Sequence, residues 1–283
     1  MLAVHNQFAA VRAEGQERVA TIAGRLRRSR PVVGDQVELR ILEDGSARIE
    51  SVRERRGTLL RGGFRNWPQV VAAHVDLLVV VAAVVDPPLR PGLIDRYLVA
   101  AWRDDIAVAV ALTKTDLPHD DAAVEETRAL LRRLEHAVVD VSVPQGRGVE
   151  EVRALIGTGV AVLSGHSGVG KTTLSNELTG RADPVGVINE VIGRGRHTTT
   201  IARYIDLPGG GAIIDTAGIR SFGIVGVERE DLQDAYPEIA DAGERCKWQP
   251  CLHEGPENGC AVPGAVSPER LASYRRLLAE LAE

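Results

Sequence analysis

Long hydrophobic runs are missing from this 283-residue sequence. Its most apolar stretch, Val75–Val85, contains Asp76 and is followed by Asp86, whereas a membrane-spanning helix needs roughly 20 consecutive apolar residues. The first ten residues have no basic segment followed by an apolar one, so we expect no signal peptide. These absences predict a cytoplasmic protein without a membrane partner, in which Val75–Val85 forms a buried strand.

Cysteine is also scarce. The three cysteines, Cys246, Cys251 and Cys260, are an odd number and lie in one short segment. Without an export signal, this pattern argues against a framework of disulfide bonds and favours metal ligation.

An excess of positive charge is missing too. The formal net charge is -5, so any contact with RNA has to come from a local basic patch rather than from the whole surface. Hydrophobic residues make up 44% and charged residues 26% of the sequence, which is typical of globular domains. The length allows two or three domains, one of them a full α/β domain.

Residues 1–60 are predicted to form a small β-barrel of the oligonucleotide-binding type. Short β-like runs alternate there with turn signals such as Glu14-Gly15 and Glu43-Asp44-Gly45, and regular short strands in a small segment suit such a barrel. Four arginines cluster between residues 25 and 30. They form either a solvated barrel edge or a contact for RNA, and the sequence leaves both open.

Strands alternate with helices in residues 61–225, which predicts a doubly wound α/β sheet. Five apolar runs are expected to be its buried parallel strands. They are Val75–Val85, Ile106–Leu112, Val138–Val141, Val160–Leu163 and Ala212–Ile214. Residues 226–283 are expected to form a third unit, which holds the cysteines and a last helix that begins at Ser267-Pro268.

The segment Gly165–Thr172 matches the phosphate-loop pattern G-x-x-x-x-G-K-[ST] at every fixed position, between a predicted strand and a predicted helix. In such loops the backbone N–H groups and the helix N-terminus point at phosphate oxygens. Lys171 is expected to neutralise the β- and γ-phosphates, and the Thr172 hydroxyl to bind Mg²⁺. A chance match is on the order of one per cent, so an ordinary glycine-rich turn is the weaker interpretation. The predicted phosphate-binding residues are Gly165, His166, Ser167, Gly168, Val169, Gly170, Lys171, Thr172 and Thr173.

Two other segments favour guanine over adenine, Thr113–Asp116 and the residues Ser142-Val143 at the end of the next strand. Thr113–Asp116 closes an apolar strand and resembles the N/T-K-x-D motif of GTPases. The Asp116 carboxylate can accept hydrogen bonds from the ring N–H and the exocyclic amino group of guanine, and the stem of Lys114 can lie along the base. An ATP-using enzyme is the alternative, and Asp116 is the main evidence against it. The predicted guanine-contacting residues are Thr113, Lys114, Thr115, Asp116, Ser142 and Val143.

Two later segments complete the set of motifs. Ile213–Gly218 resembles the D-x-x-G motif, in which Asp215 would hold Mg²⁺ through water and the Gly218 N–H would sense the γ-phosphate. Thr198 and Thr199 lie in a polar segment that is either a switch loop closing over Mg²⁺ and phosphate or a plain loop between strands. Together the motifs favour a Mg²⁺-dependent enzyme that hydrolyses GTP to GDP.

The motifs stand in circularly permuted order, because the guanine motif precedes the phosphate loop and Asp215–Gly218 comes last. A permutation keeps the same sheet and moves only the termini. With these motifs the sequence resembles the ribosome small-subunit-dependent GTPases, bacterial proteins that assist late maturation of the small ribosomal subunit. The resemblance covers nearly the whole chain and includes Pro31–Asp35 and Ile94–Leu98. It implies a barrel, a permuted GTPase domain and a zinc domain that bind the 30S subunit and its 16S rRNA, and we expect a monomer.

The chain departs from the family pattern at several positions. Thr113 stands where asparagine is more usual, and Ala217 replaces the usual proline. Ile219 cannot orient an attacking water, and residues 223–227 contain no histidine. We therefore expect slow intrinsic hydrolysis, with much of the rate supplied by the ribosome. The alternative is an RNA-binding assembly protein that uses GTP only as a ligand, with negligible turnover.

The tail offers three thiolates and one imidazole within a short span, from Cys246, Cys251, His253 and Cys260. Soft sulfur ligands with one histidine, in a closed set of four, suit tetrahedral Zn²⁺ in a structural role. Glycine, proline and asparagine between the ligands suit a turning knuckle better than a buried strand. The sequence therefore predicts one structural zinc ion per chain, with simple burial of these residues as the alternative.

Overall fold

Apolar strands in the middle of the chain build the sheet on which the molecule is assembled. The computed structural model describes residues 1–27, 29–62, 67–180, 202–215, 224–255 and 259–282. Its strands are β1 (Ala3–His5), β2 (Phe8–Ala13), β3 (Gln16–Ile22), β4 (Val37–Ile41), β5 (Ala47–Val52), β6 (Leu59–Gly62), β7 (Pro68–Ala72), β8 (Leu77–Ala83), β9 (Ala107–Thr113), β10 (Ala137–Val141), β11 (Val160–Ser164), β12 (Arg203–Asp206) and β13 (Ala212–Asp215). Its helices are α1 (Pro91–Trp102), α2 (Asp121–Arg133), α3 (Val149–Ile156), α4 (Lys171–Leu178), α6 (Pro237–Gly243) and α7 (Pro268–Glu280), with short 3₁₀ turns over Gly24–Arg27, Val143–Gln145 and Leu232–Ala235.

The central strands are parallel and follow the order β10-β9-β8-β11-β13, with the antiparallel strand β12 beside β13. Each apolar run that was expected to be a parallel strand forms one, with ends within two residues of the predicted ones. β8, β9 and β11 are buried along almost their whole length, as expected for strands between two layers of helices. The predicted doubly wound α/β sheet is confirmed.

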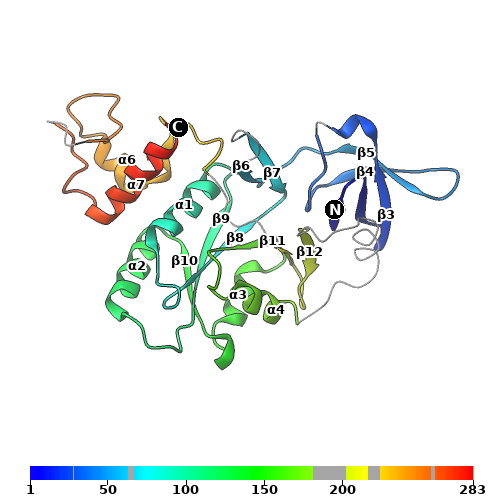
Figure 1. Ribbon diagram of the computed structural model, residues 1–283, viewed down its shortest axis with the longest axis horizontal. Coiled ribbons are helices and arrows are strands. Elements are labelled where there is room, and N and C mark those ends of the chain that lie inside the picture. Colours follow the sequence, from blue (N-terminus) through cyan, green and yellow to red (C-terminus); the bar gives the residue numbers. More distant parts are fainter. Residues whose placement is uncertain (28, 63–66, 181–201, 216–223, 256–258, 283) are drawn as a thin grey trace.

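Alternate side chains of β8 enter two different cores. Leu78 and Val80 pack on one face together with α1 and α2, whereas Val79 and Val81 pack on the other face together with α3 and α4. This alternation is the period of two that a strand imposes on its side chains. The sheet is therefore covered by helices on both faces (Figure 1).

Strands β1–β5 surround a small apolar core of their own. Their order is β1-β2-β3-β5-β4, with β3 and β5 parallel, which fits the predicted barrel of the oligonucleotide-binding type, a fold of five strands. β1 also pairs with β12 through Ala3 and Arg203, and the Tyr204 N–H donates to the Leu2 carbonyl over 2.9 Å. The barrel strands thus continue the α/β sheet at one end of the molecule (Figure 1). The boundaries proposed at residues 60 and 225 stay predictions.

The segment Pro31–Asp35 of the barrel packs against the chain that leads into β8 of the α/β sheet. Asp35 is 1% exposed and accepts hydrogen bonds from the Val32 N–H at 2.7 Å and from two guanidinium nitrogens of Arg55, each at 2.8 Å. Gly34 has φ +90, and a Cβ at this position would lie 2.0 Å from the Ala73 carbonyl oxygen. Only glycine permits this approach of the two backbones.

Helix α7 and the 3₁₀ turn Leu232–Ala235 pack against α1, and α6 packs against that turn (Figure 1). Val99 of α1 enters an apolar cluster with Tyr236, Tyr274 and Leu278. The Ser267 hydroxyl caps α7 by accepting the Arg270 N–H at 3.3 Å, so the predicted helix start is confirmed. Among the described residues, no helix is both long and apolar enough to cross a membrane.

We expect Gly34→Ala to destabilise the chain more than Gly15→Ala, which serves as its matched control. Both glycines have positive φ, so both substitutions carry the left-handed backbone cost of roughly 1–2 kcal/mol. Only Gly34 would also press a methyl group against another backbone, since Gly15 has nothing within 4 Å of an added Cβ. That overlap adds roughly 1–3 kcal/mol. Equal shifts of the urea unfolding midpoint would contradict the tight junction.

Candidate nucleotide site and metal centre

The predicted nucleotide-binding segments meet at one edge of the sheet. Because β9, β10, β11 and β13 are parallel to β8, their carboxyl ends lie side by side. Thr113 lies beside Ala83 and Val141 in the sheet register, and Ser164 lies beside Val80. Ligands of open α/β sheets bind at this edge. The fold thus gathers segments that are up to a hundred residues apart in the chain.

The phosphate loop runs from the end of β11 into α4 with the backbone conformation that its glycines allow. Gly165 has φ +153, and a Cβ there would lie 2.1 Å from the Val81 carbonyl oxygen. Gly168 and Gly170 have φ +81 and +93, and Gly170 is the N-cap of α4. The loop therefore lies against β8 and leads into a helix N-terminus, which is the geometry that exposes backbone N–H groups to phosphate.

Lys171 lies folded over this loop. Its Nζ donates to the carbonyl oxygens of Gly165 at 2.8 Å and His166 at 2.6 Å. Burial lowers the pKa of Lys171 from its ordinary value, because the charged form is disfavoured away from water. An anion placed at the loop would offset that cost.

Thr113 connects the guanine motif to the phosphate loop. It is 4% exposed, and its hydroxyl donates to the Val169 carbonyl oxygen over 2.6 Å. The departure from asparagine at this position therefore preserves a hydrogen bond between the two motifs. The side chain is directed at the loop backbone, which leaves recognition of the base to Asp116.

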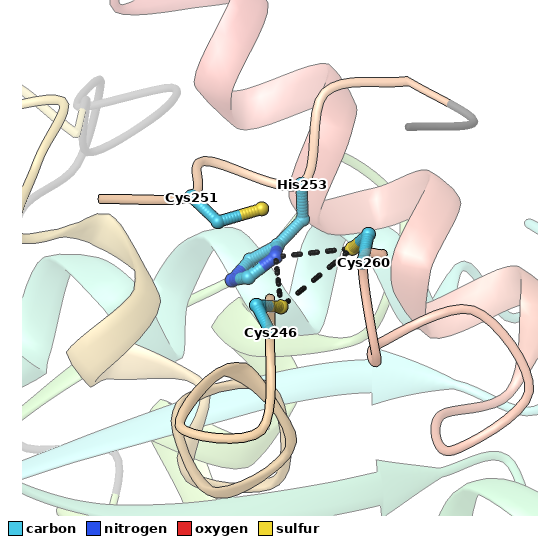
Figure 2. Close-up of side chains that lie close together, drawn as sticks. All are labelled: Cys246, Cys251, His253 and Cys260. Atoms are coloured by element: carbon cyan, nitrogen blue, oxygen red, sulfur yellow. Dashed lines mark hydrogen bonds between the residues drawn. The ribbon is translucent and has the colours of Figure 1, made fainter. Parts of the chain in front are cut away.

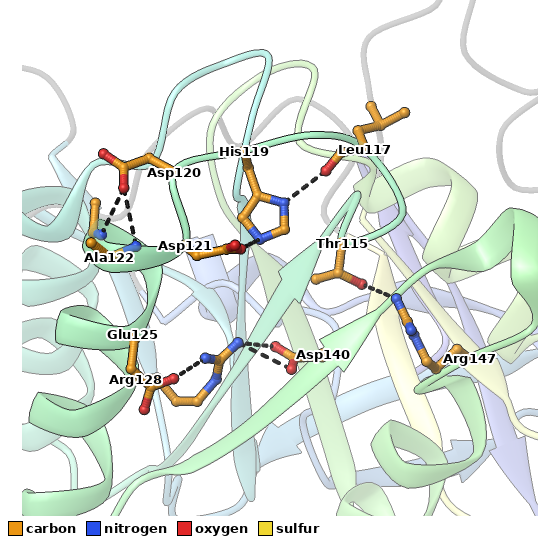
Figure 3. A network of polar contacts seen from close by, with 11 residues as sticks. Thr115, Leu117, His119, Asp120, Asp121, Ala122, Glu125, Arg128, Asp140 and Arg147 are labelled. Carbon is orange, nitrogen blue, oxygen red and sulfur yellow. Dashed lines mark hydrogen bonds and ion pairs between the residues drawn. The ribbon is translucent and has the colours of Figure 1, made fainter.

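The guanine motif is held from both sides by polar contacts. Lys114 has φ +61 and donates from Nζ to the Asp86 carbonyl oxygen. Arg147 donates to the Thr115 hydroxyl at 2.9 Å, and this bond joins the loops that follow β9 and β10 (Figure 3). Farther out, Arg128 of α2 binds both oxygens of Asp140 on β10 (Figure 3).

Asp116 lies at the end of this motif as an ionised acceptor. The pKa of Asp116 lies below its ordinary value, chiefly because the Ser142 hydroxyl lies beside its carboxylate. Its Oδ1 is enclosed and accepts no hydrogen bond from the part of the chain that the structure describes. An enclosed carboxylate oxygen of this kind fits a ligand that brings its own N–H donor. Ser142 is buried, and Val143 begins the following 3₁₀ turn.

The Mg²⁺ ligands and switch residues are only partly described. Thr172 lies in the first turn of α4, and Asp215 ends β13 next to β11. Both therefore lie at the nucleotide edge. The other predicted residues, Thr198, Thr199 and Gly218, lie outside the described residues, as do Ala217 and Ile219.

The four predicted metal ligands converge in the C-terminal unit (Figure 2). Their ligand atoms all lie within 4.8 Å of one another. His253 Nδ1 is 3.8 Å from the Cys246 sulfur and 3.4 Å from the Cys260 sulfur, and these two sulfurs are 3.9 Å apart. Burial raises the pKa of the Cys251 thiol to about 11, so the protein alone favours the neutral thiol there. The cluster could hold one metal ion.

Helices α6 and α7 hold this cluster in place. From α7, the Tyr274 hydroxyl donates to the Leu252 carbonyl at 3.2 Å and Arg275 donates to the His253 carbonyl at 2.7 Å. At the end of α6, a Cβ on Gly243 would lie 3.0 Å from the His253 ring. The metal knuckle and the C-terminal helices therefore form one packed unit.

Two further residues at the nucleotide edge were not predicted from the sequence. Arg147 fixes Thr115, and Tyr97 of α1 lies beside Ser164 and the backbone of Gly165. Tyr97 lies in the Ile94–Leu98 segment, which was marked by family resemblance without a role. No local pattern of the sequence indicates either contact, because each joins elements that are far apart in the chain.

The sheet order, the phosphate loop and the guanine motif ahead of it define a GTPase domain of circularly permuted order. The model of the RsgA GTPase family matches residues 52–225, and the chain belongs to this family.

Relatives and solved structures agree with this assignment. The small ribosomal subunit biogenesis GTPase RsgA of Azotobacter vinelandii is 39% identical over 260 residues, covering 89% of this chain and 75% of the relative. The protein of the same name from Chlorobaculum parvum is 39% identical over 267 residues, covering 89% and 85%. The crystal structure of YjeQ from Thermotoga maritima matches with a TM-score of 0.74 at 25% identity, covering 99% of this chain and 96% of that one. YloQ, described as a circularly permuted GTPase, has the same fold, with a TM-score of 0.72 at 24% identity over 99% and 93% of the two chains.

We expect Thr113→Val to weaken GDP binding about 2- to 10-fold, because it removes one buried hydrogen bond of roughly 0.5–1.5 kcal/mol from the phosphate loop. The substitution keeps the shape of the side chain, so the fold should persist. Thr113→Asn can donate to the same carbonyl and should restore binding. Titration of GDP by calorimetry measures both, and equal affinity of the valine variant and the wild type would contradict the role assigned to the hydroxyl.

Proposed function

We propose that this chain is a cytoplasmic, monomeric GTP hydrolase that acts in biogenesis of the small ribosomal subunit and contacts 16S rRNA. The observation that carries the proposal is the permuted nucleotide edge, in a chain that aligns over 89% of its length with proteins named small ribosomal subunit biogenesis GTPases. Those names favour an enzyme with turnover over an assembly protein that only holds GTP. Turnover of GTP and of ATP, measured with and without purified 30S particles, tests it.

In this proposal, the chain positions GTP and leaves the electrostatic part of the chemistry to Mg²⁺, which neutralises phosphate charge when bound. Backbone N–H groups of residues 165–173 hold the β-phosphate, and Lys171 neutralises the β- and γ-phosphates. Thr172 and Asp215 bind the metal directly and through water. Thr198, Thr199 and Gly218 would close over the γ-phosphate.

Guanine selectivity is assigned to Asp116. An ionised carboxylate only accepts hydrogen bonds, and guanine presents two donors on the edge that faces it, whereas adenine does not. The enclosed Oδ1 of Asp116 supports this assignment, as does the depressed pKa of its carboxyl.

We expect Asp116→Asn to weaken GTP binding by roughly 1–3 kcal/mol, or about 5- to 150-fold, because the amide turns a donor toward the guanine amino group. Xanthosine triphosphate has a carbonyl in place of that amino group and should bind the variant better than it binds the wild type.

The matched control is Asp121→Asn, which changes the same charge at an exposed position of α2 and should leave both affinities unchanged. Fluorescence titration with labelled nucleotides measures each of these affinities. Equal binding of ATP and GTP by the wild type would refute the assignment to Asp116.

The barrel supports the proposed contact with RNA through a surface hollow. Among its lining residues are Gln7 and Phe8 at the start of β2, Arg25 in the 3₁₀ turn that follows β3, and Arg48 of β5. Arg25 also binds Glu50, so part of the arginine cluster is held within the barrel. An aromatic ring beside arginines suits stacking on a base and contact with phosphate.

Zinc is the metal that we assign to the cysteine cluster. In a tetrahedral site with Zn–S of about 2.3 Å and Zn–N of about 2.0 Å, two sulfurs lie about 3.8 Å apart and a sulfur and a nitrogen about 3.5 Å apart. The separations of 3.9, 3.8 and 3.4 Å fit these values. The donor set of three thiolates and one imidazole is closed, which suits a structural rather than a catalytic ion.

We expect Cys251→Ser, or chelation, to remove the metal, to disorder the knuckle and to reduce 30S association and its stimulation of GTP hydrolysis. A segment of this length buries too little apolar surface to fold alone, so the metal contributes most of its folding energy. GTP binding to the isolated protein should change little, because the GTPase sheet has its own core and the contact between Arg270 and Asp95 that joins α7 to α1 lies outside the knuckle.

The reciprocal control is Lys171→Ala, which should lose GTP binding and keep one zinc ion per chain. Metal analysis, sedimentation with 30S particles and phosphate release measure the outcome. If the serine variant is stimulated normally by 30S particles, the link between the metal and the ribosomal partner is wrong.

A further inference from the structure

Helix α1 lies between the nucleotide edge and the C-terminal unit, and it contacts both. Ile94, Tyr97 and Leu98 pack into the core of the α/β sheet, whereas Val99 packs with the C-terminal helices. Residues two apart on a helix point about 200° away from each other. Asp95 and Tyr97 therefore face opposite neighbours from the same turn of one rigid element.

On the nucleotide side, Tyr97 contacts the base of the phosphate loop. It is 1% exposed, and burial raises the pKa of its phenol, whereas the Ser164 hydroxyl and the Gly165 backbone beside it act in the opposite direction. Tyr97 also lines a small hollow behind the loop, together with Gly165 and Val169. Since Gly165 already lies against the Val81 carbonyl, the phenol holds the first loop residue from a second side.

On the C-terminal side, Asp95 takes part in a buried cluster of charges. Asp95 and Arg270 are each 4% exposed, and Arg270 donates to Asp95 and to Glu238 of α6. The guanidinium also lies 4.1 Å from the centre of the Tyr236 ring. A buried charge that loses its partner is strongly destabilised, so this cluster holds α1 to α6 and α7 in one arrangement.

The two helices α1 and α7 approach closely beside this cluster. A Cβ on Gly92 would lie 3.3 Å from the Ser273 hydroxyl and from the Arg276 guanidinium. One turn farther along, Arg96 binds Glu280. A displacement of α7 would therefore carry α1 with it rather than slide past it.

We propose that Tyr97 is a positioning residue for the phosphate loop, and that Asp95 couples it to Arg270, so that docking of the C-terminal unit sets the geometry of the nucleotide site through α1. This inference rests on the phosphate-loop function proposed above. It adds a connection between the C-terminal unit and the nucleotide site that runs through α1. This connection is separate from the chain segment that follows Asp215. A partner that binds the C-terminal unit could thereby change nucleotide affinity.

The first test is Tyr97→Phe, which keeps the ring in the core and removes only the hydroxyl. We expect GDP to bind about 3- to 10-fold more weakly, with an unchanged melting temperature and zinc content. The matched control is Tyr274→Phe, an equally buried tyrosine whose hydroxyl donates to Leu252 within the C-terminal unit. It should leave GDP affinity unchanged, because it has no contact with the phosphate loop.

The second test measures coupling. Asp95→Asn keeps the size of the side chain and can still accept from Arg270, so it should fold, and it should weaken GDP binding although Asp95 touches no nucleotide. In the Tyr97→Phe background it should weaken binding no further, because both substitutions break one connection. Multiplicative losses in the double variant would overturn the coupling.

The outcomes separate this inference from the proposed function. If the wild type and Lys171→Ala both failed to bind GDP or GTP, the phosphate-loop function would be wrong, and this inference with it. If the wild type binds, Lys171→Ala does not, and Tyr97→Phe binds as the wild type does, only the positioning role of Tyr97 is overturned.

Discussion

The phosphate loop has to be held with its backbone N–H groups facing a ligand, and two neighbours supply that constraint. Gly165 lies against the Val81 carbonyl of β8, with no room for a side chain. The Thr113 hydroxyl of β9 binds the Val169 carbonyl in the middle of the loop. A fixed loop carries its donors to phosphate without an ordering cost at the moment of binding. The rest of the fold keeps these groups of β8 and β9 in place beside the loop.

Charge pairs lie at the junctions between the units, and they restrict how the units can be arranged relative to one another. Asp95 and Arg270 at the C-terminal junction form a charge pair whose side chains are 5% and 3% exposed, whereas Asp35 beside the barrel junction is buried and its partner Arg55, also within residues 1–60, is 22% exposed. Such pairs add little net stability over apolar contacts, but a misplaced partner is costly. They therefore select one relative arrangement of the units, where an apolar contact alone would tolerate sliding.

Local patterns in the sequence were enough to predict the strands, the phosphate loop and the metal ligands. Apolar runs mark buried strands directly, and motif spacing follows from the short loops that carry the ligands. Thr113 shows the limit of such patterns. From the sequence alone, threonine in place of asparagine indicated that a side chain near the base was lost. In the fold, its hydroxyl binds the carbonyl of Val169, which lies 56 positions away. The same holds for the bond from Arg147 to Thr115 and for the pairing of β1 with β12. Contacts of this kind depend on the assembled sheet, and no local periodicity encodes them.

Circular permutation gives these long-range contacts their importance. In this order the chain leaves the nucleotide edge after β13 and continues directly into the C-terminal unit. A covalent connection alone would let that unit rotate, because a single chain crossing fixes neither angle nor distance. The contacts of α1 with α6 and α7 remove this freedom, and Arg103 at the end of α1 also donates to the Val225 carbonyl on the outgoing chain at 2.7 Å. The C-terminal unit is thus attached both to the strand that carries Asp215 and to the helix that contacts the phosphate loop. The C-terminal unit is therefore attached on two sides of one ligand site. In this arrangement, a movement of the unit would change the contacts of a bound nucleotide.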